Sequence, residues 1–88
     1  MAYYKVHNLR EGGRDGNWEK ATGKKANLCH NILCSSKATD GAHVQLDTPY
    51  DNRWYIVPLC HRCNCQFGEH FTVSGPLVSA TDSSVILW

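Results

Sequence analysis

Residues 29–34 read Cys29-His-Asn-Ile-Leu-Cys34, and residues 57–64 read Val-Pro-Leu-Cys60-His-Arg-Cys63-Asn. The two cysteine pairs have the spacings C-x4-C and C-x2-C, with 25 residues between them. Two close pairs separated by a hairpin-length insert are typical of small domains that hold one tetrahedral zinc ion. Thiolate is a soft ligand that zinc prefers, and a short loop directs two sulfurs at one ion. We therefore expect a structural zinc site made by Cys29, Cys34, Cys60 and Cys63.

Other cysteine and histidine chemistry near these pairs gives alternatives. Cys60 and Cys63 also fit a redox dithiol at a helix N-terminus, although a thioredoxin-like enzyme would need a βαβ setting that this pattern does not predict. Cys65 has no partner by spacing, so we expect a buried or half-buried thiol, with a role as fourth ligand as the alternative. His30 and His61 lie inside the two cysteine loops, where either replaces a cysteine ligand in an alternative arrangement.

Length and composition predict one small domain spanning residues 1–88. A chain of 88 residues buries a modest core, so a metal ion is expected to contribute much of its stability. The sequence shows neither a signal peptide nor an apolar run approaching the roughly 20 residues of a membrane span. Five cysteines are an odd number, which favours a reducing cytoplasm over a disulfide framework. A secreted domain with two disulfides and one spare thiol is the alternative.

Charge is distributed unevenly along the chain. The formal net charge is +1, which excludes a strongly basic nucleic-acid binder. Residues 1–29 nevertheless carry a balance of +3, against −2 for residues 30–88. A basic amino-terminal arm is able to meet phosphate groups, and a solvated surface with ordinary lysines is the alternative.

Hydrophobic periodicity predicts a small α+β, β-rich domain. Ala42, Val44 and Leu46 alternate with polar residues, which indicates a half-buried strand, and the run 53–59 is expected to pair back on it. Trp18 is expected to anchor its segment to the core. The remaining expectations are a strand over 3–9, a loop over 11–17, a turn over 48–52, a helix over 60–67 capped by Gly68, and tail strands over 71–73, 77–80 and 85–88. Knuckle, hairpin and short helix together predict a treble-clef zinc domain with extra short strands at both ends.

The segments Gly41-Ala-His43-Val and Val57-Pro-Leu-Cys60-His-Arg-Cys63-Asn64 carry a family resemblance. Over about residues 29–68 the chain resembles the HNH (His-Me finger) nuclease superfamily. The resemblance implies that His43 is a general base that activates water. It also implies that Asn64 is a helix ligand for a divalent cation, Mg²⁺ or Mn²⁺, on the scissile phosphate. A satisfied structural histidine or a zinc ligand is the alternative for His43, and a helix-turn hydrogen bond is the alternative for Asn64.

Two positions depart from the family pattern. Ala42 stands where the family has an aspartate that binds the cation, and Tyr55 stands near the place of an asparagine that orients the histidine. The scaffold is therefore more similar to the family than the active site is. The same layout is similar to small uncharacterised bacterial proteins, a likeness that names no activity.

These observations lead to two hypotheses of different classes. The first is a zinc-binding HNH-like module that binds nucleic acid or a protein partner without catalysis. The alternative is a divalent-metal-dependent HNH endonuclease that cleaves DNA with His43 as general base. The absence of an acid at Ala42 favours the first, and the sequence alone leaves the question of enzymatic activity open.

Overall fold

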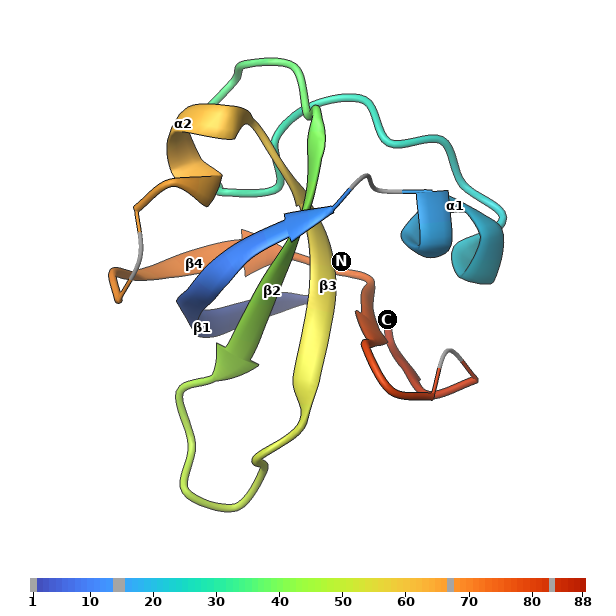
Figure 1. Ribbon diagram of the computed structural model, residues 1–88, viewed down its shortest axis with the longest axis vertical. Helices are drawn as coiled ribbons and strands as arrows, with labels where there is room; N and C mark the ends of the chain where they lie inside the picture. Colours follow the sequence, from blue (N-terminus) through green and yellow to red (C-terminus); the bar gives the residue numbers. More distant parts are fainter. Residues whose placement is uncertain (1, 14–15, 67, 83) are drawn as a thin grey trace.

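The protein is a small β-rich domain in which a six-stranded antiparallel sheet curls into a half-barrel (Figure 1). The computed structural model describes residues 2–13, 16–66, 68–82 and 84–88. Neither helix within these ranges is long and apolar enough to cross a membrane. The elements are β1 (Tyr3–Gly13), α1 (Gly16–Thr22), β2 (Asp40–Leu46), β3 (Trp54–Leu59), α2 (His61–Asn64), β4 (His70–Ser74), β5 (Leu77–Ser79) and β6 (Ile86–Leu87).

The hairpin of β2 and β3 is the centre of the sheet. Its register runs without interruption from Asp40↔Leu59 to Gln45↔Trp54. The period-two pattern of the sequence is confirmed, because Ala42 and Val44 are fully buried. The hairpin therefore has two distinct faces, and every side chain of β2 belongs to one or the other.

The other strands extend this hairpin on both sides, in the order β4-β1-β2-β3-β5-β6. β1 is longer than predicted, because it continues through Gly13 where a loop was expected. Backbone pairing to β2 requires no side chain, and register shifts after Asn8 and Arg10 allow the strand to bend as it continues. The helix α1 was not predicted, since its seven residues carry no apolar periodicity.

Two apolar clusters lie on the two faces of the sheet. The larger contains Tyr55, Val57 and Leu59 of β3 together with Cys29, Cys60 and Cys63. The smaller contains Trp18 of α1 with Ile56 and Val78. Trp18 is 2% exposed, which confirms its predicted anchoring role. The cysteines are thus part of the main core.

The helix α2 is shorter than the predicted span 60–67. Cys60 is its N-cap, Cys65 is its C-cap, and Gly68 follows later with φ of 77°, so Gly68 is not the cap. The reason is competition from β1: the Gly68 N–H donates to the Asn8 carbonyl (2.9 Å), and the Asn8 N–H donates to the Glu69 carbonyl (3.0 Å). Phe67 lies outside the described residues.

Candidate metal centre

Four cysteines from two distant parts of the chain meet at one point. Cys29 and Cys34 come from the loop between α1 and β2, Cys60 follows β3 as the N-cap of α2, and Cys63 lies in α2. Their four sulfur atoms all lie within 4.8 Å of one another. The Sγ atoms of Cys34 and Cys60 are 3.8 Å apart.

This spacing fits a tetrahedral metal ion. A Zn–S bond is about 2.3 Å, so the sulfurs of a tetrahedral four-thiolate site lie about 3.8 Å apart. A disulfide would require about 2.0 Å between two sulfurs, and all five cysteines are free thiols. The cluster of Cys29, Cys34, Cys60 and Cys63 could therefore hold a metal ion such as Zn²⁺.

Backbone hydrogen bonds give the 29–34 loop its shape. The Cys34 N–H donates to the Asn31 carbonyl (2.9 Å), which closes a tight turn, and the Cys29 N–H donates to the Ser36 carbonyl (2.7 Å). The His30 N–H donates to the Pro58 carbonyl (2.9 Å), so the loop is tied to β3, the strand that precedes Cys60. The loop is thereby held against the second cysteine pair by the backbone alone.

Polar donors surround the sulfurs. The Cys63 N–H donates to the Cys60 sulfur at 3.5 Å, and the side-chain amide of Asn31 donates to the Cys63 sulfur at 3.6 Å. Asn31 is only 9% exposed. Donors of this kind stabilise negative charge on a thiolate, and they orient the sulfur toward a metal ion.

The thiols differ in acidity in the metal-free chain. Burial raises the pKa of Cys29 and of Cys63. Hydrogen bonds from the backbone and side chain of Ser36 lower the pKa of Cys34 to about 6. Metal binding requires thiolates, so it must displace protons from the two buried thiols.

The alternative ligands do not join the cluster. The Nδ1–H of His30 donates to the Ser74 carbonyl (2.8 Å), and burial lowers the pKa of its ring. The ring of His61 lies 3.0 Å from Asp40. Cys65 is exposed, which corrects the expectation of a buried or half-buried thiol. It lies in the C-cap, where the chain turns away from the core.

His43 and Asn64 lie on opposite faces of the sheet. Alternation along β2 places His43 with Ile56, its partner in the ladder, on the face of the smaller cluster. Asn64 belongs to α2, which packs on the face of Ala42 and contributes Cys63 to the larger cluster. The structure therefore does not bring the two predicted catalytic residues into one site.

Asp40 is a polar residue that the sequence reasoning missed. Its carboxylate accepts from the Asn64 amide (2.9 Å) and contacts His61 Nδ1 (3.0 Å). Partial burial opposes ionisation, but these hydrogen bonds outweigh it and hold the pKa of Asp40 below its usual value. The signal was available, because Asp40 and Ala42 are two residues apart and share a face of β2. An acid is thus present beside α2, two residues before Ala42.

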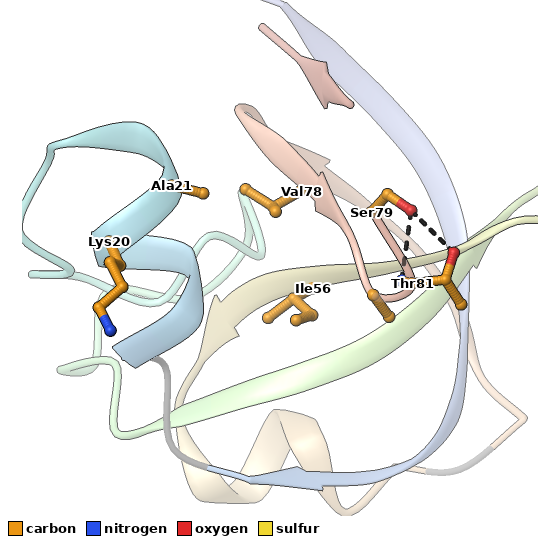
Figure 2. A pocket seen from close by; sticks show the side chains of 7 residues that line it. Lys20, Ala21, Ile56, Val78, Ser79 and Thr81 are labelled. Carbon is orange, nitrogen blue, oxygen red and sulfur yellow. Dashed lines mark hydrogen bonds between the residues drawn. The ribbon is translucent and has the colours of Figure 1, made fainter. Parts of the chain in front are cut away.

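A separate pocket lies between α1 and the adjacent strands β3 and β5, with a volume of about 310 Å³ (Figure 2). Ile56 and Val78 form its apolar wall. The hydroxyl of Ser79 lies 3.3 Å from that of Thr81 and accepts from the Thr81 N–H (3.4 Å). Lys20 of α1 also lines the pocket, so the lining offers an ammonium group beside two hydroxyls that bond to each other.

Comparison with known proteins adds no family to this description. No family model matches the chain, and no curated protein or solved structure is significantly similar to it. The functional argument therefore rests on the residues and their geometry.

Proposed function

We propose that this protein is a zinc-structured, non-catalytic binding module with the HNH-type treble-clef arrangement, and that its partner is nucleic acid. The observation that carries the proposal is the set of four cysteine sulfurs within 4.8 Å of one another. The loop 29–34 supplies two of these sulfurs, and the start of α2, after the β2–β3 hairpin, supplies the other two; loop, hairpin and short helix follow one another in the order of a treble clef.

The zinc in this proposal is structural. Four thiolates fill the tetrahedral coordination sphere, so no position remains for water or substrate. Three of the four cysteines belong to the larger apolar cluster, which ties metal binding to formation of the core. The ion then acts by joining the loop 29–34 to α2.

The surface beside the 29–34 loop has features that suit phosphate binding. A groove of about 440 Å³ runs along the loop, and Lys24 and Lys25 lie at its margin with Asn27. Both lysines are exposed, and the ammonium of Lys24 lies 5.4 Å from the ring centroid of Trp88. Two cations make a modest contact, so affinity for DNA is expected to be low and to fall with salt at a log–log slope of about −2.

The endonuclease alternative has less support. It needs His43 beside a cation held by Asn64, whereas strand alternation separates the two side chains. Asp40 and Asn64 do lie together, but they lie on the face away from His43. A protein partner is the remaining alternative.

One preparation tests the proposal. Zinc is counted by elemental analysis, and binding to a short DNA duplex is followed by fluorescence anisotropy as salt is raised. We expect one zinc per chain, and a double variant Lys24→Ala/Lys25→Ala whose log–log salt slope is smaller by about 2. The matched control is Lys5→Ala/Arg53→Ala, which removes two exposed cations outside the groove.

The same preparation separates the alternatives. Nicking of a plasmid with Mg²⁺ or Mn²⁺ that disappears in His43→Ala would replace the proposal with the endonuclease. One zinc per chain without DNA binding would reject nucleic acid as the partner. A chain that folds fully without zinc would reject the structural role of the ion.

A further inference from the structure

A second group of side chains that could hold a metal ion lies on β1, β4 and the end of β2, where strand alternation puts His7 on the face opposite Val6 and the cysteines. His7 of β1 and His70 of β4 are direct partners in the strand register. Asp47 follows the end of β2, and its N–H donates to the Lys5 carbonyl (2.9 Å), which fixes it beside β1. The three residues are far apart in the sequence, so no local motif signalled them.

The carboxylate of Asp47 contacts both rings. Its Oδ1 lies 3.0 Å from His7 Nδ1, and its Oδ2 lies 2.7 Å from His70 Nδ1. The two ring centroids are 5.3 Å apart.

Gln45 determines which nitrogen of His7 is available. The Gln45 amide N–H₂ donates to the Asn52 carbonyl (2.8 Å), which turns Oε1 toward His7 Nε2 at 3.2 Å. His7 Nε2 must then carry a proton to donate to Oε1. Nδ1 consequently faces an oxygen of the Asp47 carboxylate, and that contact is favourable only if a proton or a metal ion lies between the two atoms.

We propose that His7, Asp47 and His70 form a second, solvent-open site for a divalent transition-metal ion such as Ni²⁺, Cu²⁺ or Zn²⁺. Two imidazoles and one carboxylate form a ligand set that favours such borderline ions over Mg²⁺ or Ca²⁺. A metal ion bound at the two Nδ1 atoms takes the place of any proton there, and that proton passes to solvent. Gln45 then acts as the positioning residue that orients His7 through its other ring nitrogen.

The spacing of the three ligand atoms fits such an ion. Bonds of about 2.1 Å at right angles place neighbouring ligand atoms about 3.0 Å apart. The observed N···O distances are 2.7 and 3.0 Å, so little movement is needed.

Exposure to solvent distinguishes this site from the cysteine cluster. The side chains of His7, Asp47 and His70 are 27%, 20% and 58% exposed. Three protein ligands on an open surface leave coordination positions for water or an anion. We therefore expect an exchangeable ion here, in contrast to the closed four-thiolate site.

The test uses the full chain without a purification tag, already loaded with one zinc. Titration with Ni²⁺ in a calorimeter, with metal counted after dialysis, should show one further ion per chain. His70→Gln and Asp47→Asn should abolish this binding while retaining one zinc. Gln45→Leu should weaken it by about 10–100-fold.

The matched control is His61→Gln, which removes another exposed histidine that contacts a carboxylate but, among the residues that the structure describes, belongs to no three-ligand group. It should bind Ni²⁺ as the wild type does. Absence of a further Ni²⁺ in the wild type, or equal affinity in His70→Gln, would overturn the proposal. Paramagnetic broadening of wild-type NMR signals gives an answer without variants, because it must centre on His7 and His70.

Discussion

The side-chain amide of Asn8 donates a 2.6 Å hydrogen bond to the backbone carbonyl of Asn64, and this contact joins β1 to the end of α2. Both residues are almost fully buried, at 1% and 0% exposure. A carbonyl at a helix C-terminus has no partner within the helix, so Asn8 supplies the missing donor. The strand thereby fixes the helix that carries Cys63.

Replacement of Asn8 should destabilise the fold through this helix end. Asn8→Ala leaves the buried Asn64 carbonyl without its donor, which costs about 1–3 kcal/mol of unfolding free energy. The urea midpoint should fall while the slope of the transition is retained. Asn27→Ala is the control, because Asn27 is exposed and such changes stay within about 0.5 kcal/mol. Equal midpoints for the two variants would mean that the contact contributes nothing.

Metal removal should unfold the chain. Zinc affinities in small zinc-finger peptides correspond to about 10–16 kcal/mol, and the stability of a whole domain is about 5–15 kcal/mol. A strong chelator should therefore abolish the native circular dichroism spectrum, and added Zn²⁺ should restore it. A native spectrum after complete zinc removal would contradict this expectation.

A pair of cysteine variants separates the metal ligands from the spare thiol. Cys34→Ser removes one of the four clustered sulfurs, so zinc content after dialysis should fall well below one ion per chain. Cys65→Ser is the matched control, because Cys65 is exposed and outside the cluster, and it should keep one zinc. Loss of zinc in Cys65→Ser would move a ligand role to that residue.

The Tyr55–Asp51 contact at the turn of the β2–β3 hairpin should make the free energy of unfolding depend on pH. The Tyr55 hydroxyl donates to Asp51 Oδ2 (2.6 Å), and this bond lowers the pKa of Asp51 in the folded state. A lowered pKa means that the carboxylate stabilises the fold above the unfolded pKa of about 3.9 and loses this effect as the pH falls.

Tyr55→Phe isolates that effect. At pH 7 the variant should lose about 1 kcal/mol of unfolding free energy, and the difference from the wild type should shrink as the pH falls below about 4. Denaturant titrations at pH 7 and in acid measure both values. A difference that stays constant with pH would mean that the loss does not depend on ionisation of Asp51.

The cysteine cluster and the central hairpin could be predicted from sequence because their signals are local. The two cysteines of each pair lie within a few residues of each other in the sequence. The alternation of Ala42, Val44 and Leu46 directly indicates one buried face of β2. The position of the sheet's outer strands could not be read this way. Pairing of β1 with both β2 and β4 depends on contacts between residues far apart in the chain.

The polar sites show the same division. His43 was identified from its neighbours in sequence, but its separation from Asn64 follows from which face of β2 receives the helix. The grouping of His7, Asp47 and His70 needs the registers of three strands, and none of those registers is written in a local motif. Chemistry that depends on one loop is visible in this sequence, whereas chemistry that depends on strand order is not.

Trp18 should be the most sensitive aromatic position outside the main core. Its ring is 2% exposed, it packs with Ile56 and Val78, and its Nε1–H donates to the Pro76 carbonyl (2.7 Å). Trp18→Ala removes this packing and leaves the carbonyl without its donor. We expect a loss of about 3–5 kcal/mol of unfolding free energy.

Two further variants separate the contribution of packing from that of the hydrogen bond. Trp18→Phe keeps an aromatic ring and removes the donor, so it should lose less than Trp18→Ala by the amount that packing contributes. Trp88→Ala is the matched control, since Trp88 is 56% exposed and its substitution should cost about 1 kcal/mol or less. Urea denaturation of the zinc-loaded proteins measures all three. If Trp18→Ala cost no more than Trp88→Ala, α1 would contribute nothing to the fold, and the smaller apolar cluster would not be a core.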